Sequence, residues 1–557
     1  MKNTAFRRMV HLGIIFISLH VVLFSQQEVL EPAVGKNGMV STAHPLATET
    51  ALRILKEGGN AIDAAVAAAF AIGVVEPDGS GLGGGGCMTI YLKDLNETHY
   101  INYYQKAPGL VDEIEYSRKI DKLNAKTALV PGTTAGLITA LENYGTLDLS
   151  SVTKDAVRYA ANGFEIDNTL AGIILDNLEV LQQYKETSDI FLPDGFPLME
   201  GDTLKQSKLA NTLKVIAAEG KEGFYDCYIA TQIVNAINEA GNKFSLEDLK
   251  NYNVKVTDAL KGTYRGYEIF SANAPQSGAT IIQTMNMLEE IDFKELGHFT
   301  ESAEVLHLMS EVFLRSYADR YFNVGDPDFS ELPLELLTSK SFAKERFLTI
   351  DKSKTGEAGY RKTPEGFSIE KEEQGHTTHI SIIDKDGNMV SLTQTLGTFF
   401  GCGFSVEGIL FNSSYANFSS KAEVNKMGAG RQPRSTIAPT IILKDGKPFM
   451  CLGTPGGGRI IATLSEIMVN VIDFGMNAEE ANQAPRFYCQ VNDDFLNLEG
   501  RISEPIRAEL ENKGHHLKLY EDFDLFFGGA QFIIVDWDNH EYFGTADKRR
   551  GGMALGY

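Results

Sequence analysis

The pattern of hydrophobic and polar positions predicts a mainly helical first part of the chain. Residues 38–77 read as a strand followed by two helices, and the second helix, AIDAAVAAAFAIGVV, is apolar on every face. A helix that is apolar all round is expected to be buried all round. Residues 142–260 carry mostly amphipathic helical periodicity, and residues 302–322 predict one further strong helix.

From about residue 376 the pattern changes to paired strands separated by Gly and Asp turns. One long helix is predicted at 459–474, and more strands follow near the end of the chain. Before this part lies the stretch 352–376, which is polar, charged and rich in turn formers. We expect it to be a flexible loop that leaves the peptide bond before Thr377 accessible.

A hairpin is predicted where this second part begins. THISII and NMVSLTQT flank the turn sequence DKDGN. If residues 385–387 form the loop, Asp384 faces Asn388, and the same register places Thr377 opposite Thr395. Paired positions of this kind are close enough for side-chain contact. The pattern by itself favours an ordinary cross-strand threonine pair.

The chemistry of a threonine at position 377 gives this pair a second interpretation. A threonine hydroxyl needs a base to act as a nucleophile, and the α-amine of a threonine that begins a chain can supply one. An α-amine has a pKa near 8, which suits proton exchange at neutral pH. This interpretation requires cleavage between His376 and Thr377, and Thr395 would then hold the Thr377 hydroxyl by a hydrogen bond.

A glycine turn offers a candidate oxyanion hole. LGTPGGGRIIATLSEIMVNVIDF, residues 452–474, predicts a strand end, a turn and a helix. Free backbone N–H groups at a helix start lie at its positive end, and Gly456 and Gly457 leave room for a substrate carbonyl. The alternative is a strand–helix turn that needs glycine only for its geometry.

A second glycine-rich stretch does not predict a cofactor site. Residues 79–84, GSGLGG, fit the dinucleotide fingerprint literally, but the following CMTIYL is strand-like where that fingerprint needs a helix. No GK[ST] follows, so a phosphate-binding P-loop is excluded as well. The glycines are expected to allow close backbone packing or turns, and we expect no cofactor.

Composition narrows the class of protein. The chain has 557 residues, 43% of them hydrophobic, which excludes a disordered protein. Its formal net charge of −23 argues against nucleic acid or anionic membranes as partners. The five cysteines are single and odd in number, so they predict no disulfide framework. No HExxH or CxxC pair supports a metal site, and His376 and His379 are read as a flank and a strand residue.

The first 25 residues predict a targeting segment. Lys2, Arg7 and Arg8 precede an apolar run at 13–24, GIIFISLHVVLF, which is short for a membrane span. Cleavage after Ser25 would release an exported, periplasmic or extracellular protein. Leu23 is larger than the residue preferred three places before such a site, so an uncleaved anchor is the alternative. No other segment is apolar enough to cross a membrane.

The motifs taken together resemble the γ-glutamyltranspeptidase (glutathione hydrolase) family. The C-terminal part carries, in the order of that family, the motifs TTHISIIDKDGN, GILFN, RSTIAPT, GTPGGGRI and APRF. The part before it carries GGNAIDAAVAAAFAIGVVEP, GLGGGGCM, KAP, VPGTTAGL and ADRYFNVGDPDF, which match the family as well. The resemblance implies an α+β fold of the N-terminal-nucleophile type, with two stacked sheets between helical layers (αββα). It also implies self-cleavage into a large subunit, 26–376, and a small subunit, 377–557, which remain one folded unit.

The resemblance also assigns roles to individual residues. Thr377 would be the nucleophile, Thr395 its supporting hydroxyl, and Gly456 with Gly457 the oxyanion hole. Ser435 and Thr436 would stand where the family binds the carboxylate of the donor. The implied substrate is a small γ-glutamyl compound such as glutathione, whose acyl group passes to water or to an amine acceptor.

Three positions depart from the family at the site for the amino-acid head group. Tyr104 replaces the arginine that grips the donor carboxylate, Gly397 replaces an asparagine, and Asn417 replaces the aspartate that binds the amino group. A lost charged hydrogen bond is worth about 1.5–3 kcal/mol. The departures predict weak recognition of the γ-glutamyl head group. Two alternatives therefore remain: an acylase of the same fold for another acyl group, such as glutaryl, and a catalytically idle binding protein.

Overall fold

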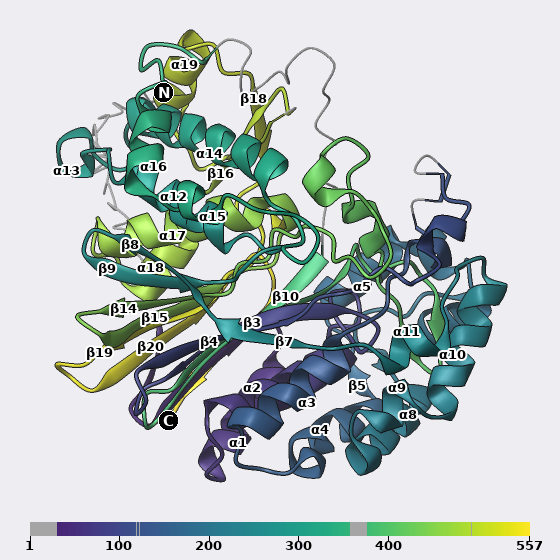
Figure 1. Cartoon of the computed structure of the whole chain (residues 1–557). Helices are drawn as coiled ribbons and strands as arrows, with labels where there is room; N and C mark the ends of the chain where they lie inside the picture. Colours follow the sequence, from purple (N-terminus) through teal and green to yellow (C-terminus); the bar gives the residue numbers. More distant parts are fainter. Residues whose placement is uncertain (1–30, 118–119, 122, 357–375, 492) are drawn as a thin grey trace, which may run out of the picture.

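Two seven-stranded antiparallel sheets lie face to face at the centre of the molecule (Figure 1). The computed structural model describes residues 31–117, 120–121, 123–356, 376–491 and 493–557. The predicted targeting segment, 1–25, and residues 357–375 of the predicted polar stretch lie outside the described residues.

The first sheet has the order β1–β20–β19–β15–β14–β9–β8. Its strands, in that order, are Ala33–Gly35, Glu541–Ala546, Gln531–Asp536, Lys447–Gly453, Thr440–Lys444, Tyr267–Ser271 and Leu260–Tyr264. The second sheet has the order β21–β2–β10–β11–β3–β4–β7. Its strands are Met553–Gly556, Gly38–Thr42, His376–Asp384, Met389–Gly397, Gly85–Leu92, Glu97–Tyr103 and Lys255–Asp258. Both sheets therefore combine strands from before and after residue 376.

Helices cover the outer face of each sheet (Figure 1). The second sheet is covered by α1 (Pro45–Lys56), α2 (Ala61–Val75) and α3 (Thr133–Tyr144), and α4 (Leu149–Asn162) packs on α2. The first is covered by α12 (Gly278–Leu288), α17 (Ile460–Ile472) and α18 (Ala478–Gln483), and α14 (Ala303–Asn323) packs on α12. This is the αββα arrangement, so the predicted fold class is confirmed.

The remaining elements are short or peripheral. The helices are α5 (Asn168–Asp176), α6 (Leu178–Leu181), α7 (Lys185–Phe191), α8 (Ser207–Glu219), α9 (Glu222–Tyr225), α10 (Tyr228–Glu239), α11 (Leu246–Lys250), α13 (Phe293–Leu296), α15 (Leu334–Leu337), α16 (Lys340–Phe347) and α19 (Glu504–Asn512). The small strands are β5 (Phe164–Glu165), β6 (Thr203–Leu204), β12 (Ser405–Val406), β13 (Ile409–Leu410), β16 (Phe487–Tyr488), β17 (Leu496–Glu499) and β18 (Leu517–Tyr520).

Helix α2 shows how the apolar pattern becomes a layer. Every residue of α2 except Gly73 is buried, as its all-round apolar sequence predicts. A capping box between Asn60 and Asp63 fixes its start, and Asp384 accepts a hydrogen bond from the Ala61 backbone at 2.9 Å. The helix packs against β10 and β11. The hairpin that carries Thr377 and Thr395 is thereby held from its outer side.

Three further features of the sequence can be compared with the structure. Residues 85–92 form strand β3 and not a helix, so the dinucleotide interpretation of 79–84 fails as expected. All five cysteines are free thiols. Within the described ranges, no helix is both long and apolar enough to cross a membrane.

Candidate active site

Thr377 and Thr395 lie opposite each other on the antiparallel strands β10 and β11. The Thr377 hydroxyl donates a hydrogen bond to the Thr395 hydroxyl, with 3.2 Å between the two oxygens. The turn is also as predicted, because the Asp384 N–H bonds to the Asn388 carbonyl and Gly387 takes a positive φ of 86°. The predicted register is confirmed.

The Thr395 hydroxyl makes two further hydrogen bonds. It donates to the carbonyl oxygen of His376 at 2.5 Å and accepts from the backbone N–H of Gly397 at 2.8 Å. One hydroxyl thus contacts the candidate nucleophile and the carbonyl of the bond that precedes it. A bulge between His376 and Thr377 shifts the strand register here, and His376 pairs with Gly397.

The bond between His376 and Thr377 is buried, and the expectation of an accessible bond is wrong. Each of these two residues is 3% exposed, and His376 is the first residue of β10 rather than the end of a surface loop. The polar composition of 352–376 misled the prediction, because its last residue pairs with β11. A separate protease cannot reach this bond, so its cleavage would have to use groups of the chain itself.

The glycine turn has the geometry expected of an anion-binding bend. Gly456 and Gly457 have φ values of 134° and 55°, which favour glycine, and a 3-10 turn at Gly457–Arg459 leads directly into α17. Among the described residues neither glycine has a backbone N–H hydrogen bond. The charge of Arg459, at the end of this turn, contributes to lowering the pKa of His376.

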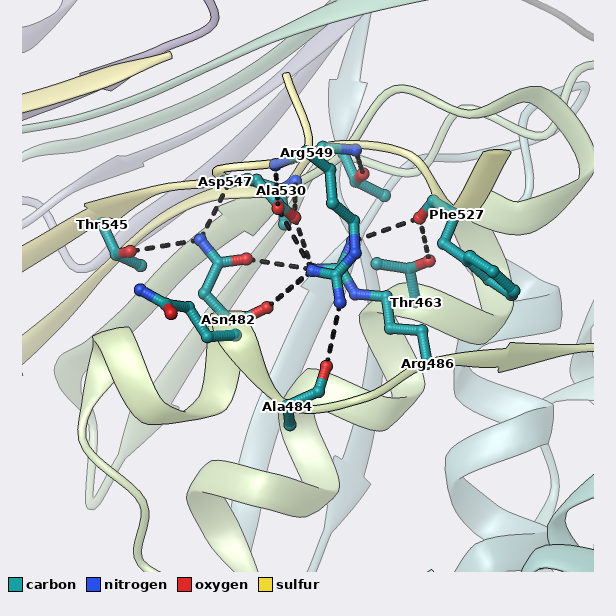
Figure 2. A network of polar contacts seen from close by, with 12 residues as sticks. Thr463, Asn482, Ala484, Arg486, Phe527, Ala530, Thr545, Asp547 and Arg549 are labelled. Carbon is teal, nitrogen blue, oxygen red and sulfur yellow. Dashed lines mark hydrogen bonds and ion pairs between the residues drawn. The ribbon is translucent and has the colours of Figure 1, made fainter. Parts of the chain in front are cut away.

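A buried ionic network supports the segment behind the glycine turn (Figure 2). Asp547 binds Arg486 at 2.6 Å and Arg549 at 3.1 Å, and all three side chains are almost completely buried. Asp547 also accepts a hydrogen bond from the backbone N–H of Ala530 at 3.0 Å, which connects the network to the loop that contains Gly528 and Ala530. Within that loop Gly528 packs directly against Gly456. The C-terminal segment, which carries Asp547 and Arg549, thus supports the glycine turn through this loop.

The candidate residues for the substrate head group also come together. The Asn417 amide donates to the Tyr104 hydroxyl at 3.2 Å, and Ser435 and Ser414 also interact with that hydroxyl. Tyr104 is buried, which raises the pKa of its hydroxyl above the usual value and keeps it neutral. Asn417 is exposed, so a substrate can reach it. The polar groups of this cluster are all uncharged.

Gly397 and Thr436 border this cluster. Gly397 has a φ of 97°, and a side chain there would meet the Ser413 hydroxyl at 2.5 Å. An asparagine in this position would therefore be strained, which gives a physical reason for the glycine. Thr436 is buried beside Ser435, whose carbonyl accepts from Ser277 at 2.6 Å.

Three charged residues near the candidate bond escaped the sequence analysis. Arg550 donates to the Thr377 carbonyl at 3.0 Å and lies 4.0 Å from the Glu76 carboxylate, and Asp78 lies 3.4 Å from the His376 ring that Arg550 contacts. Burial raises the pKa of Glu76 to about 8 and that of Asp78 to about 6, while the Arg550 charge opposes both shifts. No local motif marks these residues, because the three meet only when the C-terminal segment docks on the 76–80 loop.

Part of this cluster has the residue types of a metal site. Glu76, Asp78 and His376 bring ligand-type atoms within 4.8 Å of one another. The Arg550 guanidinium, however, lies against the His376 ring, so a fixed positive charge already stands where a cation would bind. His379 bonds two hydroxyls, those of Thr393 and Ser381, and burial lowers its pKa to about 3. The structure therefore shows His379 as a neutral strand residue.

Comparisons with known proteins agree with this geometry. A family model described as gamma-glutamyltranspeptidase matches residues 47–557. The glutathione hydrolase proenzyme of Escherichia coli K12 is 37% identical over 546 residues, which cover 94% of this chain and 92% of that protein. The corresponding proenzyme of Bacillus subtilis 168 is 34% identical over 560 residues, covering 96% and 93%. A crystal structure of cephalosporin acylase from Bacillus halodurans superposes with a TM-score of 0.85 at 28% identity, covering 96% of this chain and 99% of that one.

Proposed function

The chain belongs to the gamma-glutamyltranspeptidase family, and on that basis we propose that it is an exported, self-processing enzyme that cleaves γ-glutamyl amide bonds through an acyl-enzyme on Thr377. The observation that carries the proposal is the contact of the Thr395 hydroxyl with both the Thr377 hydroxyl and the His376 carbonyl. The basic and then apolar pattern of residues 1–25 supports export.

Self-cleavage can proceed through these two hydroxyls. The Thr377 oxygen attacks the His376 carbonyl carbon, its proton passes to the Thr395 oxygen, and the Thr395 proton passes to the carbonyl oxygen. The C–N bond then breaks as that proton moves to the Thr377 nitrogen, leaving an ester on the Thr377 oxygen. Water hydrolyses the ester to a His376 carboxylate and a free Thr377. No external base is needed, which suits a buried bond.

The same threonine then serves turnover. Its new α-amine, with an ordinary pKa near 8, takes the hydroxyl proton as the oxygen attacks the substrate carbonyl. The N–H groups of Gly456 and Gly457 would receive the developing oxyanion, which is the use that their lack of internal partners supports. The leaving amine takes the proton, and water or a second amine then releases the acyl group.

A second candidate is an acylase for an acyl group without a charged amino-acid head. The neutral cluster of Tyr104, Asn417 and Ser435 favours it, because no carboxylate in that cluster is placed to bind an ammonium. The fold similarity to a cephalosporin acylase is compatible with this alternative.

The deciding experiment uses the purified protein. We expect intact-mass analysis to show two polypeptides, and incubation with a γ-glutamyl anilide to release the aniline. An uncut chain that releases no aniline from γ-glutamyl or glutaryl anilides would refute the enzyme assignment. A cut chain that is active only on the glutaryl compound would favour the second candidate.

A further inference from the structure

The side chain of His376 fills a buried slot formed by four surrounding residues. Arg550 Nη2 contacts both ring nitrogens and lies 2.6 Å from Nδ1. Asp78 Oδ2 lies 3.4 Å from the same atom, and the Phe399 ring lies over the imidazole with 3.7 Å between centroids. Gly79 forms the back of the slot. We call these residues, Asp78, Gly79, Phe399 and Arg550, the His376 slot.

The absence of a side chain at Gly79 gives the slot its depth. A methyl group at this position would lie 2.9 Å from His376 Nδ1 and 3.5 Å from Cε1. The third of the three nearest atoms would be the Glu76 carboxyl carbon, at 3.5 Å. Alanine at 79 would therefore intrude first on the occupant of the slot.

The walls of the slot retain unused hydrogen-bonding capacity. Asp78 Oδ2 and Glu76 Oε2 are buried and have no hydrogen-bond partner among the described residues. Buried polar atoms are normally satisfied, so these two oxygens are able to accept a hydrogen bond from a bound molecule or from water. Burial and the Arg550 charge lower the pKa of His376 well below its usual value. The slot thus holds a neutral ring that accepts a hydrogen bond from Arg550.

Self-cleavage would change what this slot can hold. His376 is bonded to the Thr377 nitrogen, and the proposed chemistry breaks that bond and turns the nitrogen into the α-amine. During turnover this α-amine must pass a proton to the leaving amine and take one from an attacking amine. The slot adjoins the Thr377 nitrogen, because His376 is bonded to it, so an amine whose side chain occupied the slot would lie within reach of that nitrogen.

We infer that the His376 slot, once His376 has left it, is the binding subsite for the leaving and accepting amine, and that it prefers an amine bearing a short neutral planar ring with a hydrogen-bond-accepting nitrogen. The inference rests on the proposed function. The bound His376 imidazole serves as the structural guide to this ligand. In the transfer step the amine nitrogen forms a bond to the acyl carbon, the ester bond to Thr377 breaks, and the amine proton returns to the Thr377 oxygen through the α-amine.

The test compares acceptor amines that differ only in their side chains. Matured enzyme is acylated with γ-glutamyl or glutaryl anilide at pH 8, where a free imidazole is unprotonated. L-histidinamide, L-phenylalaninamide and L-leucinamide are offered at equal concentrations, and the transfer products are quantified by mass spectrometry. We expect histidinamide to exceed each of the other two by about tenfold, the size of one well-placed hydrogen bond to a charged group.

Two glycine variants locate the preference in the slot. Gly79→Ala should reduce the advantage of histidinamide over the other two amines to less than about threefold. The rate of transfer to leucinamide per cleaved enzyme should remain within about threefold of the wild-type rate. Gly81→Ala is the matched control, because its methyl would meet only the Gly73 carbonyl at an ordinary 3.7 Å. If Gly79→Ala does not mature, the ratio of transfer to histidinamide over the other two amines in the wild type tests the inference by itself.

Direct binding gives an independent readout. Histidinamide should bind the matured wild type in calorimetry but not the uncut Thr377→Ala variant, in which His376 still fills the slot. Equal transfer to the three amines, or equal binding to both proteins, would overturn the inference while leaving the proposed function intact. If neither anilide released aniline from cut protein, the proposed function would be overturned and the inference with it.

Discussion

The hydroxyl of Thr395 lies 2.5 Å from the carbonyl oxygen of His376 and donates a hydrogen bond to it. That carbonyl belongs to the bond whose cleavage would free Thr377. The same hydroxyl accepts from Thr377 at 3.2 Å, so nucleophile, proton relay and electrophile form one continuous chain. The β10–β11 pairing creates this arrangement, and the sheet holds it before any substrate arrives.

Removal of the nucleophile should stop maturation. We expect wild-type protein to give two polypeptides, the smaller beginning Thr-Thr-His-Ile, and Thr377→Ala to remain one chain on denaturing gels and by intact mass. Thr378→Ser is the matched control, because it changes the residue next to Thr377 but keeps the hydroxyl that interacts with Glu76. Cleavage of Thr377→Ala at the same bond would show that another group is the nucleophile.

Removal of the Thr395 hydroxyl should slow both cleavage and turnover. Thr395→Val keeps the shape of the side chain but loses the donor to the His376 carbonyl, and loss of one such donor costs about 10²–10³ in rate. Thr395→Ser retains the hydroxyl and should restore most of both rates. Time courses of chain cleavage and of anilide hydrolysis provide the measurements. Unchanged rates in the valine variant would rule out the relay.

Discrimination between γ-glutamyl and glutaryl donors should be weak. The two acyl groups differ by an ammonium, and the cluster around Tyr104 and Asn417 offers it only neutral groups. We expect kcat/KM values for the two anilides to differ by less than about a hundredfold, which corresponds to roughly 2.7 kcal/mol.

An engineered carboxylate provides the comparison for this prediction. Asn417→Asp places an anion at an exposed position of the cluster and should raise the γ-glutamyl to glutaryl ratio. A larger ratio than a hundredfold in the wild type would mean that another group recognises the ammonium. The amino-acid substitutions noted at 104, 397 and 417 would then not control donor choice.

The buried carboxyl of Glu76 should make the stability of the uncut chain depend on pH. Its folded pKa is raised above the unfolded value of 4.5, chiefly by burial. The unfolded state therefore loses the proton first, and the stability that Glu76 contributes at low pH declines as pH rises from about 4.5 through the folded pKa. In the Thr377→Ala background, Glu76→Gln should lessen the fall in Tm between pH 5 and pH 8 by roughly 1–3 °C.

The exposed Glu345 supplies the control for this measurement. Glu345→Gln in the same background should leave the pH dependence of Tm unchanged, because this side chain is solvent-exposed and its replacement alters no buried group. An equal pH dependence with and without Glu76 would mean that Glu76 is ionised in the folded chain. The Arg550 charge would then outweigh the effect of burial.

The local pattern of the sequence determined the hairpin, the buried helix α2 and the glycine turn. Each depends on neighbours in the chain: strand alternation and the DKDGN turn fix the pairing of Thr377 with Thr395, and helical periodicity marks α2. The motif resemblance added the family and the αββα fold. The positions of Tyr104, Asn417 and Ser435 could also be named from motifs, although their common hydroxyl cluster required the fold.

Only the tertiary structure decided which distant residues surround the candidate bond. Arg550 reaches Thr377 and His376 because the C-terminal segment crosses from β20 of the first sheet to β21 of the second. Asp78 and Glu76 come from a loop about three hundred positions before the candidate bond. The burial of His376 likewise follows from its pairing with Gly397, against the polar composition of the residues before it. Local periodicity carries no information about such contacts, since they depend on how whole layers pack.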